Sequence, residues 1–163
     1  GMSMNLNQFR NMFPGEIACR RYLEKVIWPN GRVCPHCGGL KSWLLSGPSA
    51  RSGLYECSDC KGQFTVTTKT PMHSTKLPLR TWLLGMYFMI NSSKGISSVV
   101  MARLTGVTQP TAWRMGHVIR QMMDPDCYDA VLLQGIVELD EIYVGGKPPS
   151  NAVNKRGKGT SKQ

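Results

Sequence analysis

Four cysteines form two Cys-x-x-Cys pairs with the spacing of a tetrahedral metal site. The pairs are Cys34–Cys37 and Cys57–Cys60, and nineteen residues separate them. Each pair can form a tight turn that supplies two thiolates. Four thiolates would close the coordination sphere, so we expect a structural zinc ion rather than a catalytic one. His36 lies inside the first pair, where we expect it to be a spacer and not a ligand.

Other chemistry is possible for the same cysteines. They could close two disulfides or form a redox dithiol, but a redox pair stands alone beside a βαβ pattern, which this sequence lacks. Iron in a rubredoxin-like site competes with zinc, because four sulfurs in a tetrahedron suit both metals. Gly38, Gly39 and Gly62 follow the two pairs. Glycine permits sharp turns there, which bring backbone amides close to the sulfurs.

The sequence around the cysteines predicts a zinc ribbon over residues 31–70. Residues 42–45, 54–56 and 63–68 have the composition of three short strands. Tyr55 and Phe64 are the expected core residues of this small unit. So little apolar core cannot stabilise a fold alone, and the metal must supply much of the folding energy.

Helical spacing of apolar residues predicts the elements on either side of the ribbon. Residues 5–12 and 16–27 predict two helices, which we assign to an N-terminal unit over residues 2–30. Residues 79–90 are strongly apolar and predict a buried helix. The predicted fold class is therefore α+β, with a ribbon between helical segments.

Residues 71–129 predict a helix-turn-helix unit. Residues 96–104 and 108–123 would be its two helices, joined by a short turn that contains Gly106. Thr108 is the expected N-cap of the second helix. An ordinary helical hairpin is the alternative, but a DNA-binding unit is favoured because both predicted helices lie almost entirely within residues 71–121, which contain no acidic residue.

In a helix-turn-helix motif the second helix enters the major groove with its N-terminal residues first. The candidate DNA contacts are Gln109, Thr111, Arg114, His117, Arg103 and Arg120. The candidates for the packing side are Ala112, Met115, Val118, Ile119 and Met122. Trp113 could lie on either face.

The net charge of +10 is unevenly distributed along the 163 residues. Residues 71–121 contain six basic and no acidic residues, whereas residues 122–141 contain six acidic and no basic residues. The acid-free stretch indicates a polyanionic partner, namely nucleic acid, and a merely soluble basic surface is the alternative. We expect no membrane span, because the longest apolar run is too short. Free cysteines without an export signal predict a cytoplasmic protein.

The acidic segment contains a second candidate site. Residues 135–146 predict a buried strand on which Glu138 and Asp140 point to the same side. Buried paired carboxylates are costly unless they bind metal or transfer protons. Solvated acids on an edge strand are the alternative interpretation.

The order of these features resembles bacterial insertion-sequence transposases of the ISXO-like group. The resemblance covers residues 9–154 and rests mainly on the ribbon and on Val137-Glu138-Leu139-Asp140-Glu141-Ile142-Tyr143-Val144-Gly145-Gly146-Lys147. It implies a DNA-binding N-terminal region and an RNase H-like catalytic domain of the DDE type, which cuts and rejoins DNA. It also implies two Mg²⁺ or Mn²⁺ ions on three carboxylates, of which Asp140 would be the first.

The sequence departs from this family pattern after Glu141, because no Asp or Glu follows. We therefore expect residues 130–147 to be the start of a truncated catalytic domain and residues 148–163 to be a disordered basic tail. Alone, the chain should bind zinc and double-stranded DNA without cutting the DNA. A second copy of the chain, forming a homo-oligomer on DNA, is a further candidate partner. The rival hypotheses are a non-enzymatic DNA-binding regulator and a ribbon-based protein-interaction module.

Overall fold

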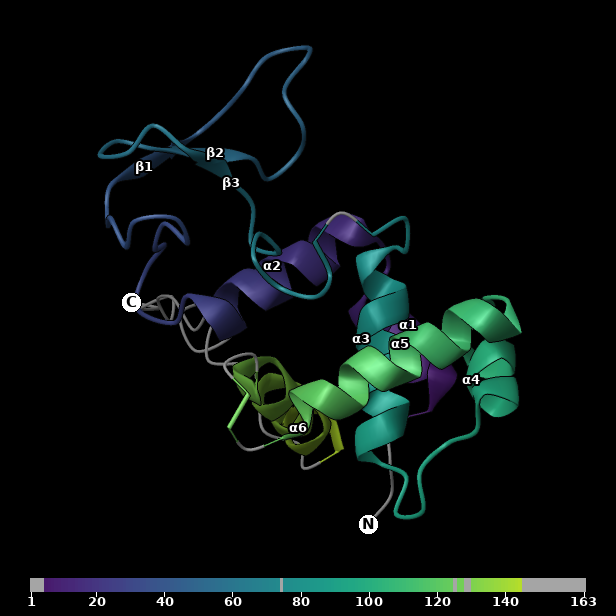
Figure 1. The fold of residues 1–163 in the computed structure, drawn as a ribbon. Helices are drawn as coiled ribbons and strands as arrows, with labels where there is room; N and C mark the ends of the chain where they lie inside the picture. Colours follow the sequence, from purple (N-terminus) through teal and green to yellow (C-terminus); the bar gives the residue numbers. More distant parts are fainter. Residues whose placement is uncertain (1–4, 74, 125, 128–129, 145–163) are drawn as a thin grey trace, which may run out of the picture.

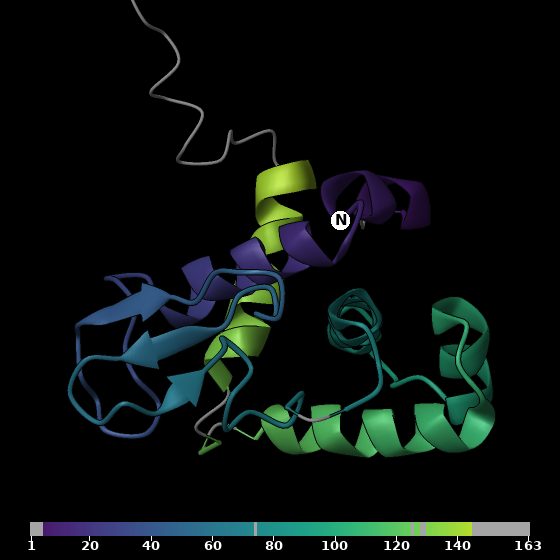
Figure 2. The ribbon, with the colours of Figure 1, turned by 90° about the horizontal axis from the view of Figure 1, so that it is seen from above.

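The computed structural model describes residues 5–73, 75–124, 126–127 and 130–144 (Figure 1). Within this part the protein has six helices and one three-stranded antiparallel sheet, which agrees with the α+β prediction. The sheet lies to one side of a helical body, as Figure 2 shows from a second direction. No helix of the described part combines the length and apolar character needed to span a membrane.

The N-terminal helices α1 (Leu6–Met12) and α2 (Glu16–Ile27) lie within a residue of their predicted bounds. A capping box starts α1: the Gln8 amide donates to Asn5 Oδ1, and the Asn5 amide donates to Gln8 Oε1, both at 2.8 Å. Helix α2 buries Cys19 and Leu23 in the core of the helical body, as its apolar stripe predicts.

Strands β1 (Ser42–Leu44), β2 (Tyr55–Cys57) and β3 (Gln63–Phe64) pair in the order β1-β2-β3. The third strand is shorter than predicted, because residues 65–68 form a turn. Side-chain oxygens take over the backbone hydrogen bonds there: the Thr65 amide donates to Thr68 Oγ1 at 2.9 Å. Threonine hydroxyls compete with strand pairing in this way.

Helix α3 (Leu79–Ile90) has its predicted bounds and is buried along most of its length. Its first turn is capped by a carboxylate from another helix, since Glu16 accepts hydrogen bonds from the Leu79 and Arg80 amides at 2.9 and 3.3 Å. A negative charge at a helix N-terminus also offsets the helix dipole. Helices α2, α4, α5 and α6 all contact α3, so this helix is the centre of the body.

Helices α4 (Ser98–Thr105) and α5 (Gln109–Met122) form the predicted pair joined by a short turn. Gly106 has a φ of 78°, the left-handed conformation that ends α4 and favours glycine. Thr108 occupies the N-cap position of α5, but its hydroxyl donates to Thr111 Oγ1 at 3.0 Å rather than capping a backbone amide.

The predicted strand at residues 135–146 is wrong, because residues 130–144 form helix α6 (Ala130–Val144). Residues two apart share one side of a strand but not one face of a helix. The predicted pairing of Glu138 with position 140 therefore does not hold. Residues 145–163, including the expected basic tail, lie outside the described residues.

Packing against α2 and α3 explains the helix. Leu132, Ile136 and Leu139 are buried, and their spacing is helical. The Tyr22 hydroxyl donates a hydrogen bond to the Gly135 carbonyl. A Cβ at Gly135 would lie 2.6 Å from a Val26 methyl, so α6 approaches α2 as closely as glycine allows. Tertiary burial thus outweighs the strand preference of the β-branched residues.

This close approach predicts that Gly135→Ala destabilises the protein by about 1–3 kcal/mol through overpacking against Val26. Chemical unfolding would measure the loss, and adding Val26→Ala should restore part of it. Gly116→Ala is the matched control, because a Cβ there meets nothing within 4 Å. That change should be neutral or stabilising by up to about 1 kcal/mol. A neutral Gly135→Ala would contradict the described position of α6.

Candidate metal centre and nucleic-acid interface

The four predicted ligand cysteines converge on one point. Their sulfur atoms all lie within 4.8 Å of one another. Cys34 Sγ is 3.7 Å from Cys60 Sγ, and Cys37 Sγ is 3.6 Å from Cys57 Sγ. A tetrahedral zinc ion with Zn–S bonds of about 2.3 Å places its sulfurs about 3.8 Å apart. The donor set therefore fits a structural zinc ion, and in the described residues no other cluster of three or more potential ligands occurs.

Backbone amides surround the sulfurs in both halves of the site. The Gly39 amide lies 3.4 Å from Cys37 Sγ, and the Gly62 amide lies 3.3 Å from Cys60 Sγ. Amide donors favour the thiolate over the thiol. Because thiolates are the forms that bind metal, these amides favour coordination.

Glycine is needed at positions 39 and 62 because a side chain would not fit there, as well as because the backbone turns sharply. A Cβ at Gly39 would lie 2.7 Å from Asp59 Oδ2, and one at Gly62 would lie 2.9 Å from the His36 ring. The His36 ring is itself fixed, since its Nε2 is 2.9 Å from the Gln63 carbonyl oxygen. His36 therefore braces the ribbon and is not part of the sulfur cluster, as predicted.

The pKa of the Cys57 thiol is lowered to about 7, chiefly by the backbone amide of Cys60. The pKa of Cys37 is raised to about 12: the Gly39 amide lowers it, but the contact with Cys57, burial and the remaining thiols raise it more. Without metal, the thiols therefore share protons unequally. Metal binding must displace these protons, so the affinity for metal falls as the pH falls.

The ribbon core is small and reaches into helix α2 and the turn after it. Tyr55 and Phe64 are buried, as predicted, and their rings lie 5.8 Å apart. The indole of Trp28 contacts both rings edge-on at 5.9 Å. Arg32 lies over the Tyr55 ring at 3.9 Å. Trp28 also packs against the core of the helical body, so it links the two units.

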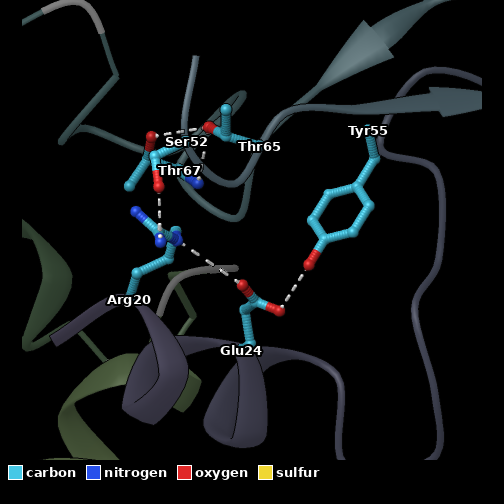
Figure 3. A network of polar contacts seen from close by, with 6 residues as sticks. All are labelled: Arg20, Glu24, Ser52, Tyr55, Thr65 and Thr67. Carbon is cyan, nitrogen blue, oxygen red and sulfur yellow. Dashed lines mark hydrogen bonds and ion pairs between the residues drawn. The ribbon is translucent and has the colours of Figure 1, made fainter. Parts of the chain in front are cut away.

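Polar contacts add a second link between the ribbon and α2 (Figure 3). The Tyr55 hydroxyl donates to Glu24 Oε2 at 2.9 Å, and Arg20 Nη2 donates to Ser52 Oγ at 2.9 Å. Arg20 and Glu24 also form an ion pair at 3.9 Å. The two hydrogen bonds to the ribbon join residues about thirty positions apart in sequence. No local pattern could have identified them, and sequence reasoning missed them.

Helix α5 has one buried and one exposed face. Ala112, Met115, Ile119 and Met122 are buried and Val118 is half-buried, as predicted for the packing side. Of the candidate DNA contacts on this helix, Gln109, Arg114, His117 and Arg120 are exposed and Thr111 is half-buried. Figures 1 and 2 show α5 along one side of the body, in contact with α3.

Arg103 belongs to a different surface. It lies on α4 and lines a pocket of about 260 Å³ together with Arg10 and Arg80. No carboxylate lines this pocket, and the one ion pair of the described residues joins Arg20 to Glu24. Sequence reasoning missed Arg10 and Arg80, because α1, α3 and α4 bring them together only in the fold.

The predicted catalytic residue Asp140 falls within α6, and its side chain lies outside the described residues. Glu138 is exposed on α6, one turn beyond the Gly135 carbonyl that accepts the Tyr22 hydroxyl. Burial, followed by the charge of Glu138, raises the pKa of Tyr22 well above its usual range. Tyr22 therefore stays neutral and acts as a hydrogen-bond donor.

The sulfur cluster predicts one zinc ion per chain, measurable by elemental analysis. Cys57→Ser should remove a ligand, release the metal and unfold the ribbon, because little else stabilises it. Cys127→Ser is the control, since Cys127 lies outside the cluster. It should retain one zinc ion. Amide hydrogen exchange over residues 34–64 would follow the fold, and a protected ribbon without metal would contradict this account.

Comparison with known proteins bears on the ribbon and on most of the chain. Residues 14–63, which include the four cysteines, match the transposase zinc-ribbon domain of the IS1595 type. The chain is 29% identical over 133 residues to an uncharacterized protein in transposable element ISH50 of Halobacterium salinarum. The alignment covers 81% of this chain and 43% of that protein, so the chain spans less than half the length of this relative. No solved structure matches. The two similarities support a transposase.

Proposed function

We propose that this chain is the N-terminal DNA-binding region of an insertion-sequence transposase of the ISXO-like group. Its ligand is duplex DNA at the ends of the mobile element. One observation supports the proposal: a segment that matches a transposase zinc ribbon is fixed to α2 of a helical body in which the α4–α5 pair has an exposed basic face. Residues 71–121 of that body contain no carboxylate to repel phosphate.

In this proposal α4 and α5 act as a helix-turn-helix motif, and the exposed face of α5 enters the major groove. Gln109 and Arg114 are both exposed near the start of α5. A glutamine side chain can bond adenine and an arginine can bond guanine, each through two hydrogen bonds. His117 and Arg120, farther along the helix, would contact phosphates or neighbouring bases.

The remaining candidates have supporting roles. Thr111 is half-buried and its hydroxyl accepts a hydrogen bond from the Thr108 hydroxyl, so it helps to fix the start of α5. Arg103, with Arg10 and Arg80, would contact phosphate away from the groove, because three arginines and no acidic residue line one pocket. Arginine is well suited to planar, two-point contact with phosphate.

Catalysis belongs, in this proposal, to the complete protein. The family resemblance supports DDE-type cleavage and transfer of DNA strands with two Mg²⁺ or Mn²⁺ ions, which would stabilise the attacking and leaving oxygens. Asp140 would be the first metal-binding carboxylate. Because no Asp or Glu follows Glu141 in this chain, we expect no cleavage by the chain alone.

A second candidate function is a ribbon-based protein-interaction module. Leu40 and Leu44 expose 76% and 54% of their surface on the ribbon, and Trp43 lies between them in sequence. Exposed apolar side chains that gather on one unit are typical of interaction surfaces. This function predicts weak DNA binding that does not depend on sequence.

A binding selection of the zinc-loaded chain from a random duplex pool tests the proposal. We expect one enriched motif at moderate salt, and Arg114→Ala should lose about 1–3 kcal/mol of discrimination at one position of that motif. Arg21→Gln is the control, since it removes an exposed arginine from α2 instead. Similarity of the motif to element ends would separate a transposase from a regulator.

Two outcomes of the selection would count against the proposal. Binding without an enriched motif would favour the interaction module. An enriched motif that Arg114→Ala leaves unchanged would remove α5 as the recognition helix.

For the pocket lined by Arg10, Arg80 and Arg103, the arginine pocket, we expect a substitution to change the salt dependence of DNA binding rather than its sequence specificity. Arg103→Gln should leave the enriched motif unchanged and reduce the slope of log affinity against log salt by about 0.9 for a lost phosphate contact. Arg21→Gln again serves as the control and should keep the wild-type slope. An unchanged slope in Arg103→Gln would place the pocket outside the DNA interface.

A further inference from the structure

Helix α5 carries an exposed pair of aromatic rings, Trp113 and His117, and the proposed hydrogen-bonding contacts make no use of the Trp113 ring. Trp113 exposes 57% of its surface, whereas Trp82 of α3 exposes only 3%. The Trp113 and His117 rings lie 4.2 Å apart at an interplanar angle of 66°. The two residues are four positions apart, so they share one face of α5.

The position of the pair is fixed by its own helix. Residues 112, 115 and 119 face the core, which directs Trp113 outward. The edge-to-face contact with His117 restricts the indole without covering it. Trp113 is not among the lining residues of the five main pockets in the described part of the chain.

Polar residues lie on either side of the rings. Gln109 precedes Trp113 by one helical turn, Arg114 is adjacent to Trp113, and Arg120 follows His117 by one turn. All three are exposed. The ring pair is thus an apolar spot within the basic surface proposed to enter the major groove.

The chemistry of the groove restricts what such a spot can contact. Paired bases show only their edges there, and nearly all of the exposed groups are hydrogen-bond donors or acceptors. The C5 methyl group of thymine is the apolar exception. Stacking on a base face would require an unpaired strand, and wedge insertion between base steps is a minor-groove mode.

We propose that the Trp113–His117 pair contacts a thymine methyl group in the bound duplex and selects thymine at one position of the site. This inference rests on the proposed DNA-binding function. Trp113 makes the contact, and His117 is a positioning residue that holds the indole ring. Trp113 would thus recognise one base through an apolar contact, next to the bases that Gln109 and Arg114 recognise through hydrogen bonds.

Methyl deletion in the DNA tests the inference directly. Duplexes of the enriched motif would be made with deoxyuridine in place of each thymidine in turn, which removes only the methyl group. The wild-type chain should lose about fourfold in affinity at one position, the factor expected for burial of one methyl group. Trp113→Ala should bind the thymine and uracil duplexes equally, whereas Trp113→Phe should retain part of the preference.

Trp43→Ala is the matched control, because it removes a partly exposed tryptophan from the ribbon and should keep the wild-type preference. Zinc content and helicity should be unchanged in Trp113→Ala, since the ring lies outside the core. His117→Ala should weaken the thymine preference and leave the positions that Gln109 and Arg114 recognise unchanged.

Three results would overturn the inference while leaving the proposed function intact. They are an enriched motif without thymine, equal affinity of the wild-type chain for all uracil duplexes, and a preference that persists in Trp113→Ala. If Trp113→Ala changed the solution mass of the protein instead, the ring would belong to a contact between chains. Absence of any enriched motif would overturn the proposed function itself.

Discussion

Convergence of four sulfurs on one point is the constraint on which the ribbon depends. The core cluster of this unit consists of Cys34, Tyr55, Cys57 and Phe64, and two of these four residues belong to the sulfur cluster. Strands of two or three residues cannot replace this cross-link. We therefore expect the ribbon to pack against Trp28 and to form its hydrogen bonds with α2 only when the metal is bound. The position of the ribbon on the helical body follows from that cross-link.

Packing in the helical body determines which face of α5 is exposed. Helix α3 is buried along most of its length, and its apolar surface holds Met115 and Ile119 of α5. Because the apolar face of α5 packs on α3, the basic and aromatic residues of α5 lie on the solvent-exposed face. The same core includes residues from α1, α2 and α6, so the N-terminal helices support the surface that we propose for DNA.

Features determined by local spacing could be predicted from sequence. The Cys-x-x-Cys pairs, the bounds of residues 79–90 and the buried face of α5 all follow from patterns within a few turns of chain. The strand predicted at residues 135–146 failed because its β-branched residues were weighed without the contact between Gly135 and Val26. The helical spacing of Leu132, Ile136 and Leu139 was a signal that could have identified α6.

Contacts between distant segments could not be predicted. The arginine pocket joins α1, α3 and α4, and the Tyr55–Glu24 hydrogen bond joins the ribbon to α2. Neither leaves a periodic trace in the sequence. The face of Trp113 was also undecided, because its position at the edge of the apolar stripe allows either side until α3 is in place.

The most direct test of the account is a residue-by-residue NMR map of the zinc-loaded chain on a selected duplex. The account predicts that the largest shift changes fall on the exposed face of α5, at residues 109, 113, 114 and 117. Smaller changes are expected around Arg103. Changes confined to the ribbon, with α5 unaffected, would contradict recognition of DNA through this helix.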